Sequence, residues 1–201
     1  MNTATAPVDD DTEIILSWLP QYIGLHGHAG VGKDSVAKIL ETYGYTPVAF
    51  ADRLREALYI LNPLIEEGYG GVEYRIQDLV DNFGGWDSVK RKYPEVRRLL
   101  QVLGTEVGRE MISQNVWVDS VFKTLEEDKK YVFTDVRFVN EHQAVDSRLG
   151  LLIKINRPGT EPANDHTSEQ DLPNQWFDAT IVNDGTLEDL NTKVRDILRL
   201  A

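Results

Sequence analysis

The stretch "YIGLHGHAGVGKDSVAKIL", residues 22 to 40, has a glycine spacing suited to binding phosphate. Gly27 is followed by four residues and then by Gly32 and Lys33. Small residues let backbone N–H groups converge on phosphate oxygens, the next helix adds its partial positive charge, and the lysine reaches the terminal phosphates. The expected nucleotide-binding residues are Gly27, Ala29, Gly30, Val31, Gly32, Lys33, Asp34 and Ser35.

The surroundings of this loop favour phosphate binding over the alternative, a glycine-rich turn with a surface lysine. The apolar strand "YIGL" precedes the loop, and the helix that follows has Val36, Ile39 and Leu40 on one stripe. We expect His26 and His28 to be loop or packing residues, because no further His or Cys spacing supports a metal site.

A second candidate is "DVRFVNEHQAV", which follows the apolar run "KYVFT". Asp135 then stands at the carboxyl end of a buried parallel strand, where open α/β sheets bind ligands. It could hold Mg²⁺ through water, and Arg137 could grip a phosphate. The alternative is that Asp135 caps the next helix and Arg137 forms a surface ion pair.

The candidate residues lie between short apolar runs and segments of helical periodicity, which alternate along the chain. The expected strands are "YIGLH", "PVAFA", "KYVFTDV", "LLIKIN" and "ATIVN". Strands separated by helices predict an α/β fold in which a mostly parallel sheet has helices on both faces.

The domain boundaries follow from composition. Residues 1 to 11 are small, polar and acidic, which predicts a mobile tail, and residues 12 to 201 are expected to form one domain. Residues 52 to 129 hold apolar residues at helical spacing without a convincing strand, so we expect a helical insertion.

A closing helix is predicted at the carboxyl end of the chain. Thr186 is the expected N-cap and Asp189 its capping-box partner. The residues expected on its apolar face are Leu187, Leu190, Val194, Ile197 and Leu198.

Composition narrows the classes of function. The chain has 201 residues, no cysteine and a formal net charge of -12, from 33 acidic and 21 basic residues. The acidic balance argues against broad nucleic-acid or membrane-surface binding. Without a signal peptide or an apolar run of membrane length, the expected location is the cytoplasm.

At the level of whole motifs, the chain resembles the bacteriophage-type deoxynucleoside monophosphate kinases, P-loop enzymes related in fold to adenylate kinase. The motifs that carry the resemblance are "GVGKDS", "FADRLREAL", "VRRLLQVLGTE", "VWV", "DVRFVNE", "INRPGTEPANDHTSEQDLP" and "IVNDGTLEDL". They run in the family's order over nearly the whole chain after residue 20. The resemblance implies a three-layer P-loop sandwich with a parallel five-stranded sheet, a substrate-binding insertion and a lid loop.

The resemblance also bears on Asp34, which stands where the general P-loop pattern has a Ser or Thr hydroxyl. The family loop reads Gly-Lys-Asp-Thr, so Asp34 agrees with it and Ser35 keeps the hydroxyl one position later. An acidic residue in the first helical turn suits the helix dipole, and it can hold Mg²⁺ directly or through water. The expected metal-binding residues are therefore Asp34 and Asp135.

The implied reaction moves the γ-phosphoryl group of ATP to a deoxynucleoside monophosphate, with Mg²⁺ as cofactor. The residues expected to act on the transferring group are Lys33, Arg137 and Arg157. The expected substrate-binding residues are Asp52, Arg55, Arg97, Arg98, Gln101, Asp135, Arg137 and Glu169. Residues 157 to 169 form a polar loop that is expected to close as a lid, the alternative being an ordinary surface loop.

Other readings remain open on the sequence. Another P-loop kinase, acting on a coenzyme precursor, would share the loop and the lid but would not explain "VRRLLQVLGTE". A nucleotide switch of the GTPase kind would need an Asn-Lys-x-Asp motif, which is missing. A homodimer is left open, and the location would be the host cytoplasm if a phage encodes the chain.

Overall fold

The computed structural model describes residues 19–66, 71–160 and 172–200. The chain divides into two compact units, which are described separately. The sheet unit comprises Met1–Val48 and Glu126–Ala201, and the insertion unit comprises Ala49–Leu125. Within the described ranges, no helix is both long and apolar enough to cross a membrane.

The sheet unit is built on five parallel strands in the order β2-β5-β1-β6-β7. Their bounds are Tyr22–His26 (β1), Tyr45–Val48 (β2), Lys130–Phe133 (β5), Leu151–Asn156 (β6) and Ala179–Val182 (β7). The central strand β1 lies between β5 and β6, with Gly24 opposite both Phe133 and Leu152. The predicted α/β fold with a five-stranded parallel sheet is confirmed.

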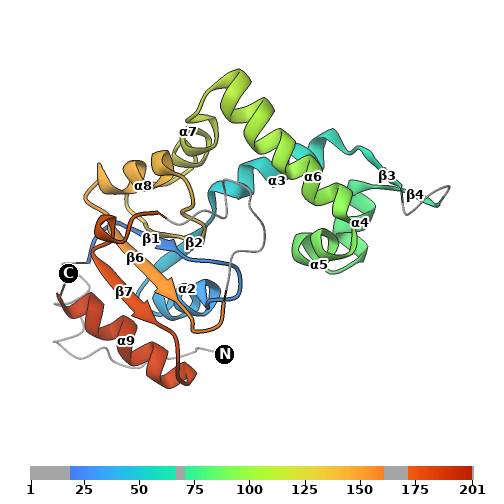
Figure 1. Ribbon diagram of the computed structural model, residues 1–201. Coiled ribbons are helices and arrows are strands. Elements are labelled where there is room, and N and C mark those ends of the chain that lie inside the picture. The colour runs from blue at the N-terminus through green and yellow to red at the C-terminus, as the bar shows by residue number, and fades with distance from the viewer. Residues whose placement is uncertain (1–18, 67–70, 161–171, 201) are drawn as a thin grey trace, which may run out of the picture. The chain divides into compact units, whose positions relative to one another are not determined.

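Helices cover both faces of this sheet (Figure 1). One face packs against α2 (Lys33–Glu41) and α9 (Leu187–Leu200), and the other against α8 (Val139–Asp146). Ile23 and Leu25 of β1 are fully buried among apolar residues of α2 and α9. Gly24 faces α8, where an added Cβ would lie 2.7 Å from Leu152 and 3.5 Å from Val145. Because both of their faces are buried, the central strands β1, β5 and β6 are nearly continuous apolar runs.

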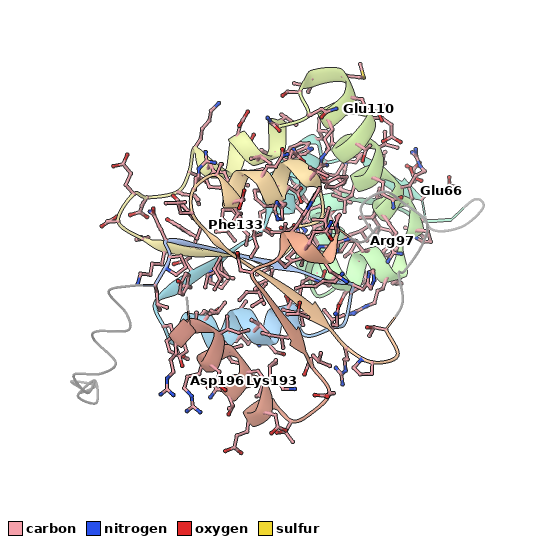
Figure 2. All side chains as sticks on the ribbon, turned by 60° about the vertical axis from the view of Figure 1, so that its left-hand side comes forward. Glu66, Arg97, Glu110, Phe133, Lys193 and Asp196 are labelled. Atoms are coloured by element: carbon pink, nitrogen blue, oxygen red, sulfur yellow. The ribbon has the colours of Figure 1, made fainter. Side chains whose placement is uncertain are left out.

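Figure 2 shows Phe133 within the sheet, and Lys193 and Asp196 on α9. The start of α9 confirms the predicted capping box, because Thr186 N donates to Asp189 Oδ2 at 2.8 Å and Asp189 N donates to Thr186 Oγ1 at 3.2 Å. Leu190, Val194 and Leu198 are buried as expected. Leu187 is 67% exposed, so its assignment to the apolar face was wrong.

The insertion unit is mostly helical. Its helices are α3 (Phe50–Leu61), α4 (Ile76–Asn82), α5 (Gly85–Lys92), α6 (Pro94–Val102), the π-helix η1 (Leu103–Ile112) and α7 (Val116–Phe122). It has its own core of buried residues, among them Leu58, Ile65, Leu79 and Val96. A short 3-10 helix, η3 (Asn174–Trp176), belongs to the sheet unit.

Two expectations about these segments were wrong. The second strand is Tyr45–Val48 rather than "PVAFA", because Ala49 N donates to the Asp52 carboxylate at 2.9 Å and α3 begins at Phe50. The insertion is not free of strands, because β3 (Leu64–Glu66) and β4 (Glu73–Arg75) pair as an antiparallel hairpin. Ile65 of β3 is fully buried, which anchors this hairpin on the core of the insertion unit.

Candidate nucleotide-phosphate site

The loop between β1 and α2 has the backbone conformation that its glycines allow. Gly27, Gly30 and Gly32 have φ of 146°, 81° and 105°, a region that other residues rarely adopt. At Gly27 an added Cβ would lie 2.3 Å from Ile155 O, and at Gly32 it would lie 2.4 Å from Asn183 Nδ2. Glycine is therefore favoured by conformation at both ends of the loop, and at Gly27 packing against backbone requires it as well.

Lys33 begins α2, and its ammonium group lies over this loop. Its Nζ donates to Gly27 O at 2.6 Å and to His28 O at 2.8 Å. The N-cap Gly32 has no side chain to occupy the first helical N–H groups, which leaves them available to an anion. The loop thus combines a lysine, a helix N-terminus and a backbone that can wrap a phosphate.

Asn183 supports the loop from the end of β7, a contact that the sequence analysis did not predict. Its Nδ2 donates to Val31 O at 2.8 Å, and its backbone N donates to Asn156 O at 2.7 Å. The available signal was its position directly after a parallel strand, at the sheet edge where ligands bind.

Asp135 and Arg137 follow β5, the strand next to β1. Both side chains are half-buried. Glu141 of α8 is 2% exposed, and its Oε2 accepts from Arg137 N at 2.8 Å and from Phe138 N at 3.1 Å. Glu141 therefore accepts from the backbone N–H groups of the two residues that precede α8.

Arg157 follows β6, the other neighbour of β1, and its side chain is exposed. Its carbonyl accepts from Thr160 N at 3.2 Å and from Thr160 Oγ1 at 2.6 Å, forming a turn in which Gly159 has φ of 78°. Most of the expected lid, 157 to 169, lies outside the described residues. Glu169 lies outside them as well.

The donors in the sheet unit suit a Mg²⁺ ion that is shared with a nucleotide. Asp34 is exposed in the first turn of α2, Ser35 follows it, and Asp135 lies after the neighbouring strand β5. No group of three or more His, Cys, Asp or Glu residues that could hold a metal occurs in the part of the chain that the structure describes. Mg²⁺ typically takes one or two carboxylates and completes its shell with phosphates and water, so these residues fit.

The candidates in the insertion unit differ in how far they are already engaged. Asp52 accepts from Ala49 N at 2.9 Å and from Arg55 Nη1 at 3.0 Å, which gives this pair a helix-capping role. Arg98 grips Glu95 with two hydrogen bonds, at 2.8 and 2.7 Å, and these bonds lower the pKa of the Glu95 carboxyl.

Arg97 and Gln101 lie one turn apart on α6. Figure 2 labels Arg97, whose exposed guanidinium forms no ion pair with any residue that the structure describes. Gln101 is half-buried, and within the same described ranges its amide has no hydrogen-bond partner. These two side chains are therefore available to a ligand in a way that Arg98 and Asp52 are not.

Two tryptophans of the insertion unit are packing residues. Trp117 is 8% exposed and donates from Nε1 to Gly104 O at 2.9 Å, and Trp86 packs against the core of the insertion unit. His26 is also buried, at 4% exposure, as the packing interpretation expected.

Comparison with known proteins decides the family. The family described as "Deoxynucleotide monophosphate kinase" matches residues 74–194, more than half of the chain. The chain belongs to the deoxynucleotide monophosphate kinase family. This membership confirms the resemblance that the motifs indicated.

Two viral members of this family illustrate the range of similarity. The deoxynucleotide monophosphate kinase of Escherichia phage RB69 is 36% identical over 52% of this chain, and the match spans 45% of the phage protein. The deoxynucleoside-5'-monophosphate kinase of Escherichia phage T5 is 25% identical over 80% of this chain and 88% of its own length.

Among solved structures, the chain is similar to shikimate kinase from Acinetobacter baumannii in complex with shikimate. The two chains are 12% identical, with a TM-score of 0.48 over 94% of this chain and 97% of the shikimate kinase.

Proposed function

We propose that the chain transfers the γ-phosphoryl group of ATP to the 5'-phosphate of a deoxynucleoside monophosphate, giving ADP and a deoxynucleoside diphosphate. The observation that carries this proposal is the loop from Gly27 to Lys33, in a chain of this kinase family. Its positive-φ glycines, and its lysine, which donates to both Gly27 O and His28 O, are the features of a loop that binds a phosphate group.

The acceptor in this reaction needs no general base. The second pKa of a phosphate monoester is about 6, so the acceptor is mostly dianionic at neutral pH. Catalysis then reduces to alignment of the two phosphates and to compensation of the charge that develops during transfer.

In the sheet unit, Lys33 balances charge on the β- and γ-phosphates, and the N–H groups of the loop hold their oxygens. Arg137 and Arg157 follow the two strands that flank β1, and each supplies a guanidinium to the transferring group. A bound Mg²⁺ ion would supply positive charge that offsets the charge on the phosphates. Asp34, Ser35 and Asp135 are the residues that would hold it.

In the insertion unit, Arg97 binds the acceptor phosphate and Gln101 reads the edge of the base. The support is that both lie on α6 and are engaged by none of the described residues. Arg98, Asp52 and Arg55 contribute to the same subsite indirectly, because their side chains hold Glu95 and the start of α3.

The decisive test is formation of ADP from ATP in the presence of each deoxynucleoside monophosphate in turn. Lys33→Ala should reduce the rate at least about a hundredfold, because the charge on the β- and γ-phosphates is then uncompensated. The melting temperature should change little, since the glycine backbone forms the loop without this side chain.

Lys38→Ala is the matched control, because Lys38 is an exposed lysine in the last turn of the same helix. It should leave the rate unchanged. A Lys33→Ala enzyme within about tenfold of the parent would overturn the proposal for the loop. Activity only on a coenzyme precursor, or nucleotide binding without any transfer, would instead support one of the two rival functions.

A further inference from the structure

His26 has a structural position that the proposed mechanism does not use. It is the last residue of β1 and directly precedes Gly27, the first glycine of the loop. Its side chain is 4% exposed and stacks on Phe177, with ring centroids 5.0 Å apart and an interplanar angle of 23°. A buried imidazole must form hydrogen bonds with other parts of the protein.

The main polar contact of His26 is with the turn after β5. His26 Nδ1 lies 2.8 Å from Val136 O. A carbonyl oxygen can only accept, so Nδ1 carries the proton and donates. His26 Nε2 lies 3.5 Å from the donor Leu172 N. The Nδ1–H group is therefore the part of the ring that binds the turn after β5.

Val136 stands between two residues of the proposed site, Asp135 and Arg137. The peptide unit that joins Val136 to Arg137 is planar, so fixing its oxygen and its N–H fixes the plane. His26 Nδ1 holds the oxygen at 2.8 Å, and Glu141 Oε2 holds the N–H at 2.8 Å. Both holding groups are buried, at 4% and 2% exposure, so water does not compete readily for these bonds.

We propose that His26 is a positioning residue that orients Arg137 through this peptide unit. Rotation of the plane would change ψ of Val136 and φ of Arg137, and with them the direction of the Arg137 side chain. Leu25 O accepts from Val136 N at 3.1 Å, so the start of the turn is tied to β1 as well. β1 thus sets both the phosphate loop and the arginine that follows the neighbouring strand. This inference rests on the proposed function, because it assigns Arg137 to the transferring group.

Two amide substitutions of His26 test the role of the Nδ1 donor. The amide nitrogen of Asn can take the place of Nδ1, whereas the longer side chain of Gln places its amide near Nε2. We expect His26→Asn to keep kcat within about threefold of the parent and His26→Gln to lose about tenfold to a hundredfold, as misplacement of a catalytic group by about 1 Å does. KM for ATP should move much less than kcat in both, and the two melting temperatures should be similar because both lose the stacked ring.

Phe177→Leu provides the packing control, because it removes the stack and leaves the donor in place. Its kcat should match that of the parent. If His26→Gln also keeps the parental kcat, or if His26→Asn and His26→Gln lose kcat equally, the positioning role is wrong and His26 only packs.

Hydrogen–deuterium exchange at the Arg137 amide tests the same claim without any reaction. Exchange should be faster in His26→Gln than in His26→Asn, and equal rates would overturn the proposal. If the unmodified chain transfers phosphate to no deoxynucleoside monophosphate, the proposed function fails while this comparison still stands.

Discussion

Asp34 lies beside Lys33 in the first turn of α2, and its charge has two possible uses. The helix dipole stabilises a carboxylate at this position. The carboxylate is also a hard oxygen ligand next to the proposed phosphate site. The side chain is exposed, and Gly32 leaves the helix without a side-chain cap. Position alone therefore allows both roles, which differ in what they do to metal dependence.

Asp34→Asn should raise the Mg²⁺ concentration needed for half-maximal rate, because a charged oxygen ligand is lost while the shape is kept. A magnesium titration of the rate measures this. If the carboxylate only serves the helix dipole, the titration curve will overlay that of the parent. The substitution would then cost a few tenths to about 1 kcal/mol of stability.

Gln101→Leu should change the ranking of kcat/KM among the four deoxynucleoside monophosphates. The substitution removes an amide that can both donate and accept, without changing charge, and polar readout is what separates one base edge from another. The rates with dAMP, dGMP, dCMP and dTMP measure the effect. An equal loss on every base would show that Gln101 packs against α6 neighbours and reads nothing.

At the scale of elements, the signals that succeeded are local in sequence. The glycine spacing from Gly27 to Lys33 and the Thr186–Asp189 capping box each span a few residues, so the sequence predicts them directly. The signals that failed needed tertiary context. Phe50 begins a helix and is 1% exposed. In the sequence, a buried apolar residue at this position looks like a continuation of the preceding strand.

The candidate site shows the same division. The contacts of Asn183 with Val31 and of His26 with Val136 join residues 152 and 110 positions apart. The spacing of residues in the sequence does not predict such contacts, because they depend on which strands are neighbours in the sheet. The roles given to Arg97, Gln101, Arg137 and Arg157 stay predictions.

The π-helix η1 was also not predicted, although its packing explains one of its glycines, Gly108. Gly104 O accepts from both Arg109 Nη1 and Trp117 Nε1, each at 2.9 Å. An added Cβ at Gly108 would lie 2.6 Å from Trp117 Nε1. The indole thus packs directly on the backbone of η1, and wide helical turns of this kind often occur at functional sites.

Gly108→Ala should destabilise the protein by about 1–3 kcal/mol, because Trp117 cannot move aside without losing its bond to Gly104 O. The better helix propensity of alanine offsets this by about 1 kcal/mol at most. Urea unfolding measures the change. Met111→Ala is the control, since Met111 lies on the same helix and is 78% exposed. A Gly108→Ala protein as stable as the control would show that the indole has room to shift.

For the molecule as a whole, the free energy of unfolding should be highest near neutral pH and should fall in both acid and alkali. Hydrogen bonds from Lys90, Arg98 and Lys193 lower the pKa values of Asp87, Glu95 and Asp184 respectively. Those from Thr186 lower the pKa of Asp189. A lowered carboxyl pKa contributes stability that is present above the unfolded value, about 4, and is lost as the pH falls through the folded value.

The alkaline limit comes from Tyr45, whose pKa is raised by burial. Its stabilising effect is complete below the unfolded value, about 10, and is lost as the pH rises above it. Urea midpoints measured from pH 3 to 11 should fall at both ends. A midpoint that stays constant down to pH 3 would contradict the acidic part, and Tyr45→Phe should make the alkaline decline smaller.

The order of strands in the sheet also has a consequence for synthesis of the chain. The central strand β1 is made first, but Tyr22 pairs with Tyr131 and Gly24 pairs with Leu152, so its partners leave the ribosome more than 100 residues later. The insertion unit, Ala49–Leu125, is complete before either partner exists and can fold first. The phosphate loop, near the beginning of the chain, gains its last support only when Asn183 has been translated. A nascent chain therefore carries its nucleotide-binding motif long before that motif has the shape to bind.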